Sequence, residues 1–469
     1  MEPDKNIDRN TVLMNSPIGG VYFIGIGGIG MSALARYFLS RGSKVSGYDK
    51  TATALTKELE AAGAEIHYED NVDLIPKDVS LVVYTPAIPA GHKEWQYYRE
   101  NGYKVVKRSD VLEIITKSSF NICIAGTHGK TTITTMTGHL LRDSGYGCNA
   151  FLGGISVNYG TNFWSHERDV CVVEADEYDR SFLKLSPDVA VITAMDADHL
   201  DIYGTAEAME EAFIDFSKRL KPGGLLVHRL GLERSSELVS ERKLTYAAQD
   251  EKADVHTRNL QMENGSYSFD VSIKGDVIPA VKLNMGGMHN VENALAAIAV
   301  ASSLGIEKDK IRDAVASFRG VRRRFEYVLL NERFALIDDY AHHPEELRAL
   351  ISSAKALFPD RHCTVVFQPH LFSRTRDLAD GFAESLDLAD EVILLPIYPA
   401  RELPVAGVTS EMILQRMKGE RKGVMEKDAM LKWMELNFSA KHGAKEVIIM
   451  AGAGDIDTLV QPVKGILEQ

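Results

Sequence analysis

The amino-acid sequence predicts an α/β protein built from three doubly wound, Rossmann-like domains. Its 469 residues are enough for about three domains of roughly 150 residues each. Short apolar runs alternate with helix-like segments along almost the whole chain, which is typical of parallel sheets covered by helices. Polar residues follow many of these runs, and open parallel sheets bind their ligands where strands end.

The first predicted domain covers residues 1–118. We expect a strand at 21–25, a helix from about Met31 to Ser40 and a second strand at 44–49. Another strand is expected at 81–85, and the chain leaves the domain through the segment 108–115.

The second predicted domain, a central P-loop type domain, covers residues 119–325, and the third covers 326–469. In the second domain we expect buried strands at 121–125, 170–176 and 189–195. Residues 243–285 alternate between polar and apolar side chains, which predicts antiparallel strands added to the parallel core, and a helix at 289–304 follows. The strands expected in the third domain are 334–339, 363–368, 391–397 and 446–452.

Composition narrows the class of function. The net charge of -13 disfavours non-specific binding to nucleic acid, which depends on basic surfaces. The charged N-terminus is unlike a signal peptide, and the apolar run 21–39 contains glycines and Arg36, unlike a transmembrane helix. No CxxC pair occurs, so we expect buried, reduced thiols at Cys123, Cys148, Cys171 and Cys363. We therefore expect a cytoplasmic protein that binds neither nucleic acid nor membranes.

The segment GTHGKTT, residues 126–132, lies between a predicted strand and a helix-like segment. It is shorter than the Walker A pattern GxxxxGK[ST], because Ile124 stands where the first glycine belongs. Gly126 and Gly129 still let backbone N–H groups approach a phosphate, and a helix N-terminus adds positive potential. Lys130 is placed to reach the β- and γ-phosphates and Thr131 to bind Mg²⁺; the alternative is a glycine turn with a surface lysine.

The segment GIGGIG, residues 25–30, also joins a strand to a helix. Asp49 ends the next predicted strand about 20 residues later, which completes the dinucleotide fingerprint. Any nucleotide diphosphate with a free ribose would satisfy the same pattern, and a tight turn without a ligand remains an alternative.

Charged side chains follow other predicted strands. Glu174 ends one beside the phosphate loop, where a carboxylate can hold Mg²⁺. His199 follows another, as a metal ligand or as a helix-capping or core residue. His289 and Asn293 begin a helix and either cap it or bind a purine. The triplet 322–324 is either a solvated linker or a phosphate clamp.

Two segments of the third domain are denser in reactive side chains. DDYAHHP, residues 338–344, places two acids, a tyrosine and two histidines after a strand. QPHLFSRTR, residues 368–376, places a histidine and two arginines after another, and arginine can bind a carboxylate through two hydrogen bonds.

The chain resembles the Mur ligases, which build the peptide of peptidoglycan, in nine motifs: GTHGKTT, EADE, DHLD, HNVENA, GVRRRFE, DDYAHHP, FQPHLFSRTR, YPARE and AGAGDI. Their order fits a three-domain enzyme. DDYAHHP and HLFSRTR are similar to the branch that adds L-alanine. The resemblance implies that ATP phosphorylates the carboxylate of UDP-N-acetylmuramate and that the amine of L-alanine attacks the acyl phosphate. We expect a monomer or weak homodimer.

The resemblance also assigns residues. ATP would contact Gly126, Thr127, His128, Gly129, Lys130, Thr131, Thr132, His289, Asn293, Arg324, Asp339 and Tyr340. Metal ligands would be Thr131, Glu174 and His199, and catalytic roles would belong to Lys130, His199, Arg324, His342, His343, Arg374 and Arg376. The sugar nucleotide would contact Gly25, Gly27, Gly28, Ile29, Gly30, Asp49, Thr85, Pro86, Ala87, Ile88, Arg108 and His128. The third domain would close over the nucleotide and help to seat alanine.

The chain departs from some relatives. Ligases that add later residues carry a carbamylated lysine, but the segment 211–218 has no lysine at the expected spacing, so we expect no carbamate. Leu371 stands where some relatives have arginine.

Three other functions compete with alanine ligation. A recycling ligase would attach a whole tripeptide, although that branch resembles DDFAHHP rather than DDYAHHP. A nicotinamide-dependent dehydrogenase is favoured only by GIGGIG and Asp49. A nucleotide-switched binding protein would not need the polar strand ends of the third domain.

Overall fold

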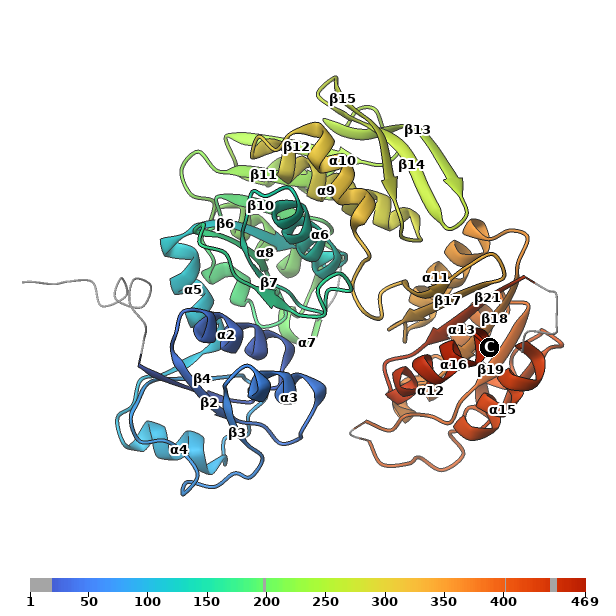
Figure 1. Cartoon of the computed structure of the whole chain (residues 1–469), viewed down its shortest axis with the longest axis horizontal. Coiled ribbons are helices and arrows are strands. Elements are labelled where there is room, and N and C mark those ends of the chain that lie inside the picture. Colours follow the sequence, from blue (N-terminus) through green and yellow to red (C-terminus); the bar gives the residue numbers. More distant parts are fainter. Residues whose placement is uncertain (1–18, 197–199, 401, 439–444) are drawn as a thin grey trace, which may run out of the picture. The chain divides into compact units, whose positions relative to one another are not determined.

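The computed structural model describes residues 19–196, 200–400, 402–438 and 445–469 (Figure 1). Its strands form sheets of five, ten and six strands, most of them paired in parallel. This confirms the predicted α/β class with three doubly wound sheets. The chain packs as two compact units. The first unit contains the described residues up to Arg258, together with Val271–Pro279 and Glu292–Val315. The second unit contains Asn259–Asp270, Ala280–Val291 and Ala316–Gln469. The predicted domain boundaries stay predictions.

The five-stranded sheet has the order β3-β2-β1-β4-β5, with all neighbouring strands parallel. Because the order reverses at β1, the loop after β1 lies at the switch point where such sheets bind ligands. The elements are β1 (Gly20–Ile24), α2 (Ile29–Ser40), β2 (Lys44–Tyr48), α3 (Ala54–Ala61), β3 (Glu65–His67), β4 (Val79–Tyr84), α4 (Lys93–Glu100), β5 (Val105–Lys107) and α5 (Arg108–Ser118).

The ten-stranded sheet has the order β15-β14-β13-β12-β11-β10-β6-β9-β7-β8. The first eight elements of this part are β6 (Phe120–Ala125), α6 (Lys130–Asp143), β7 (Asn149–Phe151), β8 (Phe163–Trp164), β9 (Val170–Glu174), β10 (Val189–Ile192), α7 (Leu200–Tyr203) and α8 (Ala206–Ser217). The remainder are β11 (Leu225–Arg229), β12 (Arg242–Ala247), β13 (Val255–Glu263), β14 (Ser266–Ile273), β15 (Asp276–Leu283), α9 (Met288–Ser303) and α10 (Lys308–Ser317).

The antiparallel part of this sheet begins later than the sequence predicts. β12 pairs in parallel with both β11 and β13. Two-residue turns then join β13 to β14 and β14 to β15, and such short links permit only antiparallel neighbours. All four turn residues have positive φ, as type I′ hairpin turns require: Asn264, Gly265, Lys274 and Gly275.

The six-stranded sheet has the order β16-β17-β21-β18-β19-β20, in which the edge pair β16 and β17 is antiparallel and the other neighbouring strands are parallel. Its strands are β16 (Glu326–Leu330), β17 (Phe334–Asp339), β18 (His362–Phe367), β19 (Glu391–Leu394), β20 (Lys422–Val424) and β21 (Glu446–Ala451). Its helices are α11 (Pro344–Leu357), α12 (Phe372–Asp377), α13 (Ala379–Leu386), α14 (Glu411–Leu414), α15 (Lys427–Phe438) and α16 (Val460–Leu467).

A continuous apolar core joins the five-stranded sheet to the ten-stranded sheet. Tyr37 of α2 packs against Phe151 of β7 and Phe163 of β8, with ring centroids 5.4 Å and 6.0 Å apart. One cluster of buried side chains includes residues of both sheets. This packing explains why both sheets belong to one unit. All four cysteines are free and buried.

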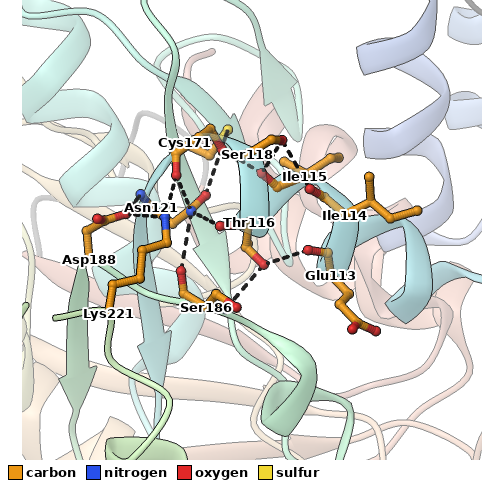
Figure 2. A network of polar contacts seen from close by, with 11 residues as sticks. Glu113, Ile114, Ile115, Thr116, Ser118, Asn121, Cys171, Ser186, Asp188 and Lys221 are labelled. Carbon is orange, nitrogen blue, oxygen red and sulfur yellow. Dashed lines mark hydrogen bonds and ion pairs between the residues drawn. The ribbon is translucent and has the colours of Figure 1, made fainter. Parts of the chain in front are cut away.

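A buried polar network ties the end of α5 to the start of β6 (Figure 2). The side chain of Asn121 donates from Nδ2 to the carbonyls of Thr116 and Ser119, and its Oδ1 accepts from Ser119 Oγ at 2.9 Å. Its backbone N–H donates to Asp188 Oδ2 at 2.8 Å, and Lys221 Nζ contacts the same oxygen at 2.8 Å. The segment that connects the two sheets is therefore hydrogen-bonded both to the end of α5, through Thr116 and Ser119, and to residues later in the chain, Asp188 and Lys221. No helix in the described part of the chain combines the length and the apolar character needed to cross a membrane.

Candidate active site

The loop between β6 and α6 has the backbone that a phosphate cradle requires. Gly126 and Gly129 have φ of +132° and +77°, which side-chain-bearing residues rarely adopt. A Cβ on Gly126 would lie 2.0 Å from Thr193 Oγ1, and one on Gly129 would lie 2.6 Å from Asn293 Oδ1. The loop therefore needs both glycines, and it brings Asn293 of α9 beside the N-terminus of α6. The first N–H groups of that 14-residue helix have no partners within the helix itself and can bind a phosphate.

The ammonium group of Lys130, the first residue of α6, has two hydrogen-bond acceptors. Its Nζ donates to the carbonyl of Gly126 at 2.7 Å and to Glu177 Oε1 at 2.6 Å. The side chain of Glu177 is 1% exposed. Burial raises the pKa of Glu177, and the neighbouring ammonium of Lys130 acts in the opposite direction. Phosphoryl oxygens can replace both of these acceptors of Lys130.

Thr131 and Glu174 form an oxygen-rich pair one residue further along. Thr131 Oγ1 donates to Glu174 Oε1 at 3.1 Å, and Glu174 Oε2 accepts from Gly153 N at 3.1 Å. A Cβ on Gly153 would lie 2.2 Å from that carboxylate, so glycine gives the acid its space. Hydroxyl and carboxylate oxygens are the ligand types that Mg²⁺ prefers. The third predicted ligand, His199, lies outside the described residues.

The remaining loop residues differ in exposure. Thr127 is buried, and its Oγ1 has no hydrogen-bond partner among the residues that the structure describes, which leaves a donor available in the loop. Thr132 is buried, whereas His128 is 74% exposed with its Nε2 3.7 Å from Asp196 Oδ2. His289 is exposed in the first turn of α9, one turn before Asn293.

The loop after β1 is organised around Asp49. Its Oδ2 accepts from Gly27 N at 2.7 Å and its Oδ1 from Thr51 N at 3.2 Å. A Cβ on Gly25 would lie 3.1 Å from Thr85 Cγ2 and 3.4 Å from the Ile88 side chain. The structure thus brings the first glycine, Asp49, Thr85 and Ile88 together at the switch point. Around them, Gly28, Pro86 and Ala87 are exposed, and Ile29 is half-buried.

Contacts within the first unit connect the GIGGIG segment to the part of the unit that carries the phosphate loop. A Cβ on Gly30 would lie 2.9 Å from Arg108 Nη1, and Arg108 Nη2 lies 3.8 Å from Asp176 Oδ2, next to Glu177. The buried side chain of Asn162 donates to the carbonyl of Ile29 at 2.6 Å. Arg108 therefore lies between the GIGGIG helix and the acidic turn after β9.

In the second unit, Asp339 is an anchor of the backbone. Its two oxygens accept from the N–H groups of Phe325 and Ala341, both at 2.7 Å. Burial raises its pKa to about 6, and those two hydrogen bonds lower it. Tyr340 is 45% exposed, and the guanidinium of Arg323 lies 5.0 Å from the centre of its ring.

The arginine triplet divides into anchored and exposed side chains. Arg323 donates to the carbonyl of Gly452 and lies 3.4 Å from Asp457 and 4.0 Å from the buried Asp338. Arg324 is exposed, as a residue that must reach a ligand would be. Sequence patterns alone did not separate these two neighbours.

Two predicted residues of the second unit, His342 and Arg374, lie beside His370. The His342 and His370 rings are 6.2 Å apart, Arg374 Nη1 is 3.5 Å from His370 Nδ1, and His370 stacks on Tyr398 at 5.8 Å. Burial lowers the pKa of both histidines. The structure does not bring the other two into contact with this group. His343 is exposed and its backbone N–H donates to Glu346, while Arg376 pairs with Asp377 at 2.7 Å on the surface of α12.

Comparisons with known proteins agree with this arrangement. Residues 20–119 match the catalytic domain of the Mur ligase family, residues 124–301 the Mur ligase middle domain and residues 323–454 the Mur ligase glutamate ligase domain. The UDP-N-acetylmuramate--L-alanine ligase of Phocaeicola vulgatus is 50% identical over 96% of this chain and 98% of its own length. The chain is a Mur ligase.

Further relatives of this Mur ligase support the assignment. A protein of the same name from Flavobacterium johnsoniae is 46% identical over 96% of this chain and 98% of its own. The crystal structure of UDP-N-acetylmuramate-alanine ligase from Thermotoga maritima is 30% identical, with a TM-score of 0.80 and coverage of 96% and 98%. A murein peptide ligase from Psychrobacter arcticus, at 22% identity and a TM-score of 0.63, shares the fold.

Sequence reasoning missed Glu177 and Arg323 as site residues. Glu177 stands three residues after Glu174 in EADE, so the two acids of one strand end contact consecutive residues of the phosphate loop. The motif itself was a signal for a second acid, but its partner lies 47 positions away and became visible only in the structure.

Proposed function

We propose that this Mur ligase joins L-alanine to the carboxylate of UDP-N-acetylmuramate, with conversion of ATP to ADP and phosphate, as a step of peptidoglycan precursor synthesis. The observation that carries the proposal is the presence of two phosphate-type loops, 25–30 and 126–132, in one unit. Arg108 lies beside Gly30 of the first loop and 3.8 Å from Asp176, which precedes the Glu177 that contacts Lys130 of the second. A dehydrogenase would leave the second loop unused. The choice of substrates follows the names of relatives that are 46% and 50% identical over nearly the whole chain.

ATP is assigned to the loop at 126–132. Phosphoryl transfer depends on positioning and on neutralising charge more than on covalent help from the protein. Lys130 and the N–H groups at the start of α6 supply positive charge, Thr127 offers a hydroxyl, and Asn293 with His289 would border the adenine. Thr131 and Glu174, together with His199, would hold Mg²⁺, which when bound neutralises phosphate charge.

The sugar nucleotide is assigned to the loop at 25–30. Its pyrophosphate would approach the backbone of this loop and the N-terminus of α2. Asp49 uses one lone pair of each oxygen to hold the loop, which leaves further lone pairs for ribose hydroxyls. Arg108 and His128 would face the diphosphate or the muramoyl carboxylate.

L-alanine is assigned to the second unit. Arg374 can bind its carboxylate, and the alanine ammonium must lose a proton before it attacks the acyl phosphate. Because burial lowers the pKa of His342 and His370, both imidazoles are neutral near pH 7 and can accept that proton. Arg324, Asp339 and Tyr340 would complete the nucleotide side of this unit.

The deciding experiment measures phosphate release from Mg²⁺-ATP in the presence of UDP-N-acetylmuramate. Reactions with L-alanine, with the L-alanyl tripeptide and with no amino acid are compared, all without a nicotinamide cofactor. We expect release only when both the sugar nucleotide and L-alanine are present. Release with the tripeptide alone would assign a recycling ligase instead, and no release in any mixture would refute ligase activity.

A further inference from the structure

The acidic turn after β9 contains a carboxylate that the reaction described above does not use. Glu177 is almost fully buried, and its Oε1 lies 2.6 Å from Lys130 Nζ. Its place is fixed by its own backbone carbonyl, which accepts from Tyr203 OH at 2.7 Å and from Arg180 N at 3.0 Å. The carboxylate is therefore held against the one loop cation that must contact the phosphates of ATP.

We propose that Glu177 is a positioning residue that holds Lys130 in the nucleotide-free loop and competes with ATP for it, so that Glu177 sets the affinity for ATP. The inference rests on the proposed function, because it requires Lys130 to bind the phosphates of ATP. Both present acceptors of Lys130, the carboxylate and the carbonyl of Gly126, are oxygens that phosphoryl oxygens replace. ATP binding then includes the separation of a buried ion pair.

The two acids of EADE therefore have different tasks. Glu174 contacts Thr131, and both of these residues offer oxygen ligands to a cation. Glu177 contacts the lysine of the phosphate loop through its Oε1. Burial raises the pKa of Glu177, and the neighbouring ammonium of Lys130 lowers it. When Lys130 moves away from Glu177, the buried carboxylate loses this partner, so its charged form becomes less stable.

The test is the dissociation constant of a non-hydrolysable ATP analogue, measured by calorimetry with Mg²⁺. Glu177→Gln keeps the shape of the side chain and removes the charge that competes for Lys130. A hydrogen bond between charged groups is strong enough that we expect about tenfold tighter binding. The KM for ATP should fall with it, while kcat changes less. Glu177→Asp withdraws the carboxylate by one methylene and should give a smaller gain.

Asp179→Asn is the matched control. Asp179 belongs to the same turn, is exposed and accepts from Ser181 N, so its loss removes a negative charge without touching Lys130. We expect its ATP affinity to change less than about twofold. Affinity for UDP-N-acetylmuramate should stay unchanged in all three variants and serves as the check of folding.

Unchanged or weaker ATP binding in Glu177→Gln would overturn the inference, and so would an equal gain in Asp179→Asn. If Glu177→Gln fails to bind the sugar nucleotide, Glu177→Asp decides by the same criteria. The outcome is separate from the test of function, because phosphate release by the unmodified enzyme tests the reaction without any variant.

Discussion

Replacing Asn121 with alanine is expected to lower the free energy of unfolding of the first unit by about 3 kcal/mol. The side chain is fully buried and takes part in three short hydrogen bonds with Thr116 and Ser119 (Figure 2). Each neutral hydrogen bond contributes roughly 1 kcal/mol net, and a buried group left without its partner adds to the cost. Since no charge is removed, the effect should not depend strongly on pH.

The assay can be confined to the first unit. The chain has three tryptophans, and in a Trp433→Phe background the remaining two, Trp95 and Trp164, both belong to the first unit. Denaturant unfolding followed by their fluorescence then reports the midpoint and slope of that unit. Comparing Asn121→Ala with its parent in this background gives the difference in unfolding free energy.

Asn101→Ala provides the matched control. Asn101 also donates from Nδ2 to a carbonyl, that of Tyr97 at 2.9 Å, but it is exposed. Its loss should cost less than about 0.5 kcal/mol. A cost below about 1 kcal/mol for Asn121→Ala, or one equal to that of Asn101→Ala, would show that the network does not stabilise the connection between α5 and β6.

Three further predictions use the same protein. Lys130→Ala should lower kcat by about 100-fold or more while the calorimetric affinity for UDP-N-acetylmuramate is retained; loss of that affinity would contradict the separation of the two loops. Thr131→Ala should raise the Mg²⁺ concentration for half-maximal activity by about tenfold, and an unchanged requirement would remove Thr131 from the metal site. Burial raises the pKa of Asp338 to about 7, above its usual value of about 3.9, so its stabilising contribution is complete below about pH 4 and is lost as the pH rises to 7. Asp338→Asn should therefore gain stability relative to the unmodified protein from about pH 5 to about pH 8, and parallel pH profiles of the denaturation midpoint would refute this.

Local sequence patterns were sufficient to predict features that depend on a single helix or strand and the turn beside it. The strand at 334–339 has the predicted bounds, and the helices α2 and α9 begin within two residues of theirs. Both glycine loops lie between a strand and a helix, as the spacing predicts. A tight turn with positive φ favours glycine, so such a turn is visible in the sequence. The resemblance to the Mur ligases is confirmed by the relatives.

Features that depend on distant residues could not be predicted. Glu177 meets Lys130 across 47 positions, and Arg323 meets the carbonyl of Gly452 across 129. The predicted antiparallel direction of β12 was wrong for a related reason. β12 has the alternating side chains of an antiparallel strand, yet it pairs in parallel with both neighbours, because alternation reports which face is buried and not which way the neighbour runs. Arg376 and His343 share motifs with buried residues, but only packing decides which member of a motif faces the interior.

The division of contacts within the molecule suits the order of the proposed reaction. The first step joins a phosphoryl group of ATP to the muramoyl carboxylate, and such a step depends steeply on the alignment of two bound substrates. The two sheets that carry these loops share one apolar core through Tyr37, and Asn162 and Arg108 add polar contacts between the two parts of the first unit. Both loops therefore belong to one packed unit. The residues assigned to L-alanine belong to the second compact unit.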